Sequence, residues 1–130
     1  MTDQVQMPKG KIYDLEERTA IFGENIIDLV RTFEKNEINR PLISQIVRSA
    51  TSIGANYMEA DGAESKKDFR HKIAICKKEA KESMHWLRML AKANQSKKDE
   101  CRTFWKEAHE LVLIFSSIIR PSKQDLDLKH

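Results

Sequence analysis

The stretch Lys66–Ala93, KKDFRHKIAICKKEAKESMHWLRMLAKA, decides the fold of this 130-residue chain. Within it, apolar and small residues recur every three or four positions. They are Phe69, Ile73, Cys76, Ala80, Ser83, Met84, Leu87, Leu90 and Ala91. Because an α-helix has about 3.6 residues per turn, this spacing puts them on one face and predicts a long amphipathic helix over residues 66–93. Ser65 and Asp68 are suited to cap its start.

Three further stretches show the same periodicity, over residues 15–35, 41–60 and 97–120. Residues suited to begin or end these helices are Asp14 with Glu17, Pro41, Ser96 and Pro121. The expected buried residues are Leu15, Thr19, Phe22, Ile26, Leu29 and Phe33, then Ile43, Ile46, Ala50, Ile53 and Tyr57, then Phe104, Ala108, Leu111, Phe115 and Ile118. Four long helices with short connections predict an all-α fold. We expect one domain over residues 1–130, an antiparallel up-down-up-down four-helix bundle with a flexible N-terminus and C-terminal tail.

The composition favours a cytoplasmic protein without a membrane span. No stretch approaches the roughly 18 consecutive apolar residues that a spanning helix needs, and residues 1–10 hold no apolar segment of a secretion signal. The two cysteines, Cys76 and Cys101, lie in separate predicted helices and form no paired motif. Reduced thiols are therefore expected, with Cys76 serving as a small apolar residue in the core.

Charge is distributed unevenly along the chain, with a net charge of −4 over residues 1–64 and +7 over residues 65–130. The excess of cations follows the helix predicted over residues 66–93. Its basic row consists of Lys67, Arg70, Lys77, Lys78, Lys81, Arg88 and Lys92, with His85 in line. Such a row is about 37 Å long and could follow a nucleic-acid backbone. No aromatic residue interleaves with these lysines, so we expect contacts to phosphates without base stacking. The alternative is an ordinary solvated helix face.

Two further sets of residues lie away from the predicted core and are candidates for a subunit interface. The apolar set is Ile75, Trp86 and Met89, and the polar set is Arg48, Ser52, Asn56 and Glu59. A wide core would also explain the apolar set, and simple exposure would explain the polar set. The helix over residues 15–35 carries Glu17, Glu24 and Asp28 on its outer face, which could meet the basic row of an adjacent copy.

No arrangement of residues indicates catalysis. A di-iron bundle needs Glu-x-x-His motifs on two helices, but Glu82–His85 and the weaker Asp68–His71 lie on the same one. Gly23 and Gly54 are isolated within helices and form no phosphate-binding loop. We expect no catalytic residue, no metal and no cofactor. An enzyme or metal protein is the alternative that elemental analysis would test.

Several segments resemble a known family. They are ERTAIFGE from Glu17, PLISQIVRSATSIGANYMEA from Pro41, AESKKDF from Ala63, KKEAKE from Lys77 and HWLR from His85. Together they look like the bacterial four helix bundle protein family, which includes proteins encoded in intervening sequences of the 23S ribosomal RNA gene. The accessory proteins of diversity-generating retroelements are similar in fold. The resemblance covers residues 15–120 and is most specific from Arg48 to Ala60.

The resemblance implies a homopentameric ring of bundles with a basic surface. In the retroelement relatives, that assembly binds nucleic acid and a reverse transcriptase. We therefore expect a non-enzymatic, homo-oligomeric accessory protein that binds RNA or DNA, RNA being favoured, with a protein partner as a further expectation. The alternative is a protein–protein interaction scaffold without a nucleic-acid role.

Overall fold

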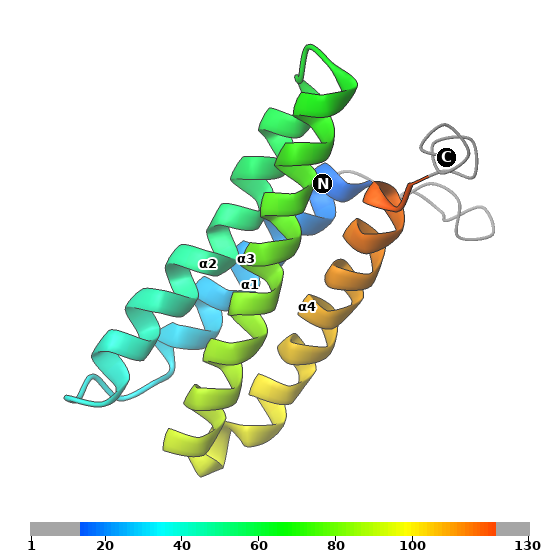
Figure 1. Cartoon of the computed structure of the whole chain (residues 1–130). Coiled ribbons are helices and arrows are strands. Elements are labelled where there is room, and N and C mark those ends of the chain that lie inside the picture. The colour runs from blue at the N-terminus through cyan, green and yellow to red at the C-terminus, as the bar shows by residue number, and fades with distance from the viewer. Residues whose placement is uncertain (1–13, 122–130) are drawn as a thin grey trace.

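Four long helices pack side by side in the computed structural model, which describes residues 14–121 (Figure 1). They are α1 (Leu15–Arg31), α2 (Asn39–Asp61), α3 (Lys66–Ala93) and α4 (Lys98–Ile119), with a 3-10 turn, η2 (Gln95–Lys97), before α4. No strand occurs between residues 14 and 121. The all-helical prediction is confirmed. The expected flexible N-terminus and tail fall on residues 1–13 and 122–130, outside the described residues.

Two predicted helix caps are confirmed. The backbone N–H of Glu17 donates to the Asp14 carboxylate at 3.1 Å, and that of Asp68 donates to the Ser65 hydroxyl at 3.0 Å. Each bond satisfies a backbone donor that the first turn of a helix leaves without a partner. The bounds of α3 coincide with the predicted residues 66–93 because its capping and periodic signals are both local.

The other helix ends differ from the prediction. α1 ends at Arg31 rather than at residue 35, and the ammonium of Lys35 instead donates to the carbonyl of Val30 at 3.3 Å. α2 begins at Asn39, two residues before Pro41, because the Asn36 side chain accepts the N–H of Asn39 at 2.7 Å. Ser96 does not cap α4, since it lies inside the 3-10 turn.

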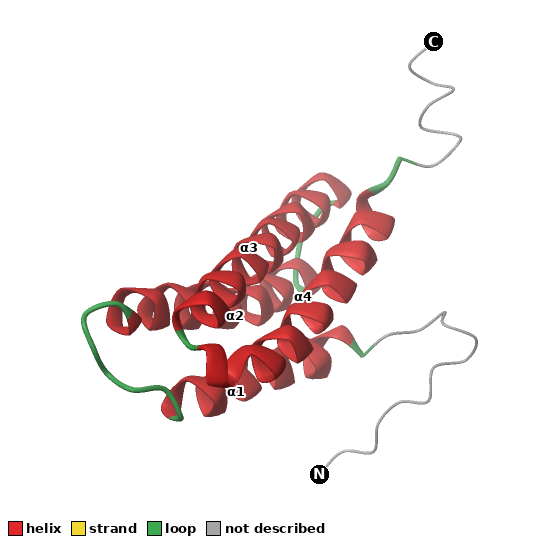
Figure 2. Cartoon of the chain, turned by 90° about the horizontal axis from the view of Figure 1, so that it is seen from below, coloured by secondary structure: helices red, strands yellow, loops and turns green. Residues whose placement is uncertain are grey.

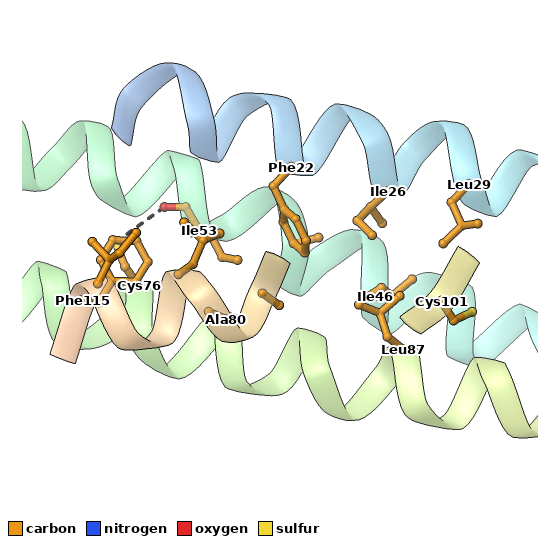
Figure 3. Close-up of a cluster of buried hydrophobic side chains, with 14 of the residues drawn as sticks. Phe22, Ile26, Leu29, Ile46, Ile53, Cys76, Ala80, Leu87, Cys101 and Phe115 are labelled. Carbon is orange, nitrogen blue, oxygen red and sulfur yellow. Dashed lines mark hydrogen bonds between the residues drawn. The ribbon is translucent and has the colours of Figure 1, made fainter. Parts of the chain in front are cut away.

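The core lies along the line where the four helices meet (Figure 3). The predicted stripes supply most of it, but Ile43, Tyr57, Phe104 and Ile118 are only half-buried. The fully buried members of the stripes include Phe22, Ile26, Ile46, Ile53, Ile73, Cys76, Ala80, Leu87, Leu111 and Phe115. The Cys76 thiol donates to the carbonyl of Ile53 at 3.5 Å, and burial raises its pKa to about 12. The prediction that Cys76 is a packing residue is confirmed.

The helices do not share their contacts equally. α3 lies against both α2 and α4 along much of its length, α1 packs on α2, and the contact between α1 and α4 is the smallest of these. Figure 2 shows the helices side by side. Between α2 and α3 the buried hydroxyls of Ser49 and Ser83 lie 2.9 Å apart. Between α1 and α4, the Arg18 guanidinium donates to both carboxylate oxygens of Glu107, at 2.7 and 2.9 Å.

Candidate nucleic-acid interface

The basic row of α3 is mostly open to solvent. Its exposed members are Lys67, Lys78, Lys81, Arg88 and Lys92, and His85 is exposed beside them. Arg70 is half-buried, because its guanidinium donates to the carbonyl of Ile119 at 2.6 Å. This carbonyl lies at the end of α4, where the helix dipole is negative. Arg70 therefore holds two helices together, a role that the sequence did not predict.

Three lysines of the row surround a hollow of about 350 Å³ on the outer face of α3. They are Lys77, Lys78 and Lys81, and the small side chain of Ala74 leaves the space between them. Within residues 14–121, none of the three forms an ion pair. Glu82 also lines the hollow, but its carboxylate binds Arg48 of α2. The hollow is thus a concentration of uncompensated positive charge.

A second and larger basic feature lies between α3 and α4. This α3/α4 groove has a volume of about 430 Å³. Its lining residues are Leu87, Arg88, Ala91, Lys98, Cys101, Arg102, Trp105 and Lys106. Four of these are cations, and no described lining residue is acidic. Arg88 belongs to the predicted row. The three cations of α4, Lys98, Arg102 and Lys106, were not predicted as site residues, because their position relative to α3 depends on the rotation of each helix about its own axis.

The α3/α4 groove also contains an aromatic residue. None interleaves with the lysines of the α3 row, but Trp105 of α4 lines the groove together with Arg88. The two residues are far apart in the sequence and meet only because α3 and α4 pack together. The indole of Trp105 is half-buried and stacks on the imidazole of His109, with ring centroids 5.3 Å apart and planes inclined at 27°. One side of the indole therefore lies against the exposed imidazole of His109.

The polar row of α2 contacts α3 and does not simply face solvent. Arg48 forms ion pairs with Glu79 at 3.1 Å and with Glu82 at 2.5 Å. The hydrogen bond to Glu82 raises the pKa of Arg48 most. Further along, Glu59 binds Lys72 at 2.6 Å and raises the pKa of that lysine. These ion pairs join α2 to α3 within one chain, and the assignment of the row to a subunit interface stays a prediction.

The two remaining members of the row, Ser52 and Asn56, are half-buried and linked to each other, since the Asn56 amide donates to the Ser52 carbonyl at 2.8 Å. The apolar candidates Ile75, Trp86 and Met89 are also half-buried. Trp86 packs against the core, which supports the wide-core alternative for this residue. Its indole nitrogen is buried and has no hydrogen-bond partner among residues 14–121.

A third groove, between α1 and α2, has the opposite charge. It measures about 430 Å³ and is lined by small residues, among them Gly23 and Gly54, with Met58 at its edge. Its acidic residues are Glu16, Glu17 and Glu24. Two of them belong to the predicted acidic face of the first helix. We call this feature the α1/α2 groove, and it forms an acidic counterpart to the basic side of α3.

The described part of the chain contains no cluster of three or more histidine, cysteine or carboxylate side chains that could hold a metal ion. Cys101 is buried at the floor of the α3/α4 groove, and burial raises its pKa to about 11. Between residues 14 and 121, no helix has the length and apolar character of a membrane span.

Comparison with known families gives a match to the family described as 23S rRNA-intervening sequence protein, over residues 13–117. The chain belongs to this family. A crystal structure similar to this member is that of a protein of unknown function from the S23 ribosomal protein family of Bacteroides thetaiotaomicron. The two chains are 30% identical, and the TM-score is 0.71. The alignment covers 82% of this chain and 98% of the other. No curated protein matches this family member.

Proposed function

We propose that this protein is a non-enzymatic, homo-oligomeric accessory protein that binds nucleic acid, RNA in preference, through the basic side of α3. The observation that carries the proposal is the set of uncompensated lysines around the α3 hollow. A phosphate backbone would neutralise Lys77, Lys78 and Lys81 and release its counterions, which is the main source of affinity in such contacts. A cytoplasmic location and an up-down-up-down course of the helices are parts of this proposal.

The proposed assembly uses the two oppositely charged sides of the molecule. The acidic α1/α2 groove of one copy would receive the end of α3 that carries the exposed Lys67 of the next copy, so that Lys77, Lys78 and Lys81 stay open to RNA. Because the two surfaces differ, an open row of copies has one unpaired acidic groove at one end and one unpaired basic surface at the other. Closure of the row into a ring pairs all of these surfaces. The small, exposed residues of the groove, such as Ala20 and Ala55, would allow a helix of the neighbouring copy to come close. The family resemblance favours five copies in that ring.

The mass in solution tests the assembly. Light scattering and native mass spectrometry distinguish one 15.1 kDa chain from a pentamer five times heavier. We expect the pentamer for the unmodified protein and a lower mass for the double variant Glu16→Lys/Glu24→Lys in the α1/α2 groove. Glu34→Lys/Glu37→Lys is the matched control, since it makes the same change in charge at exposed positions outside the groove. A monomeric wild-type protein would refute the ring.

Salt-dependent RNA binding tests the nucleic-acid role. Fluorescence anisotropy of a labelled single-stranded RNA should show an affinity that falls steeply with salt. The triple variant Lys77→Glu/Lys81→Glu/Arg88→Glu should abolish binding, and Arg31→Glu/Arg40→Glu/Lys66→Glu should retain more of it. Equal affinities for the two triple variants would show that the α3 row is not the binding site.

The second candidate function is a protein–protein interaction scaffold. Two exposed apolar side chains favour it, Met58 at the α1/α2 groove, which is 62% exposed, and Leu113 of α4, which is 51% exposed. This candidate predicts RNA binding no tighter than that of any mildly basic protein and equal affinities for the two triple variants, so the same anisotropy experiment separates the two functions.

A further inference from the structure

The four cations of the α3/α4 groove are held close together without a compensating charge. Arg88 comes from α3, and Lys98, Arg102 and Lys106 come from α4. None of them forms an ion pair with another residue in the described range 14–121. Like charges gathered at one site repel one another and raise the local concentration of anions. An anionic ligand that bridges the two helices would relieve this repulsion.

The floor of the groove has a different character from its rim. Leu87 and Cys101 form part of it and are 0% and 1% exposed, and Ala91 is half-buried beside them. Trp105 completes the apolar lining, and its indole is stacked on the imidazole of His109. The volume of about 430 Å³ lies within the roughly 300–1,000 Å³ of ordinary ligand sites. The groove thus offers apolar and aromatic surface below a ring of positive charge.

We infer that the α3/α4 groove binds an unpaired nucleotide of single-stranded RNA, with the base against the indole of Trp105 and the adjoining phosphates on Arg88 and Arg102. Only a ligand that is both anionic and aromatic uses the rim and the floor together. Inorganic phosphate would leave the floor unused, and the bases of a duplex are covered by their neighbours. Aromatic platforms beside a basic path are the usual means of holding single strands. The inference rests on the proposed function and adds a base-recognition site to it.

The groove is continuous with the basic row. Arg88 lines the groove and also belongs to the row, which continues along α3 through Lys81 and Lys77. A strand whose phosphates follow the row would therefore bring one of its bases to the groove. This arrangement predicts a preference for single strands over duplexes, which the row of α3 alone does not.

Fluorine NMR of the full chain tests the position of the base directly. The protein has two tryptophans, so 5-fluorotryptophan gives two resonances, and the one missing from Trp105→Phe belongs to Trp105. Adding an unstructured RNA of about 12 nucleotides should shift the Trp105 resonance. An RNA that binds without moving this resonance would overturn the inference and leave the proposed function intact.

Affinities of variants provide the second test. Trp105→Leu should weaken binding of the single strand by about 5- to 100-fold, without changing its salt dependence. Trp105→Phe should retain most of the affinity, and neither change should affect a duplex of the same length. Arg102→Gln should reduce the salt slope by about one, while the exposed Lys66→Gln outside the groove should reduce it less.

The outcomes separate the two proposals. If the two Trp105 variants bind single strands like the wild type while the α3 triple variant does not, the groove inference is wrong and the α3 row stands. If the wild type binds no RNA at low salt, both proposals fall. If an acidic peptide, but not RNA, moves the Trp105 resonance, the groove is a protein-binding site and the inference is overturned.

Discussion

The amides of Asn39 and Asn94 exchange two hydrogen bonds, of 2.9 and 2.8 Å, between the first turn of α2 and the C-cap of α3. Asn39 is 1% exposed, and its amide also donates to the carbonyl of Glu34 at 2.8 Å. The Asn94 amide likewise donates to the carbonyl of Leu90 at 3.0 Å. The pair joins α2 to α3 at one end of the helices. In both side chains the amide N–H groups and the amide oxygen have hydrogen-bond partners.

Removing one member of this pair should destabilise the protein. We expect Asn39→Ala or Asn94→Ala to cost about 1–3 kcal/mol, because each leaves a partner without its bond. The double variant should cost less than the sum of the two, since the second change removes a group that has already lost its partner. Urea unfolding at one fixed protein concentration measures all three. Gln95→Ala, at an exposed position nearby, is the control, and strictly additive losses would contradict the coupling.

Two glycines within helices should respond differently to alanine. A Cβ atom at Gly23 would lie 3.5 Å from Thr51, an ordinary contact, so Gly23→Ala should raise stability by up to about 1 kcal/mol through helix propensity. At Gly54 it would lie 3.3 Å from the Thr19 hydroxyl, which is held by a 2.6 Å bond to the Leu15 carbonyl. Gly54→Ala should therefore be clearly less stable than Gly23→Ala in thermal unfolding. A larger gain in stability for Gly54→Ala than for Gly23→Ala would show that the Thr19 side chain moves away from the added methyl group at little cost.

The Arg48–Glu79 ion pair should contribute to stability within one chain. The Glu79 side chain is only 11% exposed, whereas that of Arg48 is 46% exposed. Arg48→Met leaves a mostly buried carboxylate without this partner and should cost about 1–2 kcal/mol, a value reduced by the solvent around Arg48. Adding Glu79→Gln should restore part of the loss. Light scattering of the same variants shows whether Arg48 also contributes to a contact between copies.

Burial of the two thiols makes stability fall at high pH. The pKa is raised from 9.0 to about 12 for Cys76 and to about 11 for Cys101, so above pH 9 the unfolded chain loses these protons and the folded chain keeps them. The unfolded state is then favoured, by up to about 1.4 kcal/mol per pH unit for each thiol. Urea unfolding between about pH 8 and 11 should show this decline, and Cys76→Ala/Cys101→Ala should flatten it. A decline of the same slope in the double variant would rule out the thiols as its cause.

Features that depend on nearby residues could be predicted from the sequence. The caps at Asp14 and Ser65 involve partners three residues away, and the buried stripe through Cys76 and Leu87 follows from one period. The cap predicted at Ser96 was wrong because the N–H of Lys97 donates to the carbonyl of Asn94 at 2.8 Å, which places Ser96 inside a 3-10 turn that hydrophobic spacing does not reveal.

Features that depend on the mutual rotation of two helices could not be predicted. Each helix can be drawn on its own wheel, but the wheel does not say which neighbour a flank will meet. For this reason the Arg48–Glu79 pair, the contact of Arg70 with the end of α4 and the position of Trp105 beside Arg88 were all missed. Lysines and arginines on α4 gave a signal only in the total charge of the second half of the chain.

The sparse contact between α1 and α4 makes α1 the helix most easily released. The Arg18–Glu107 pair bridges these helices with partly exposed charges, whereas α2, α3 and α4 pack extensively in sequence order. Amide hydrogens of α1 should therefore exchange with solvent sooner than those of α3, and added salt should widen the difference. A released α1 would uncover the surface that normally covers Phe22 and Ile26, and a second opened molecule carries the same matching helix. This fold therefore permits three-dimensional domain swapping, in which two copies exchange α1.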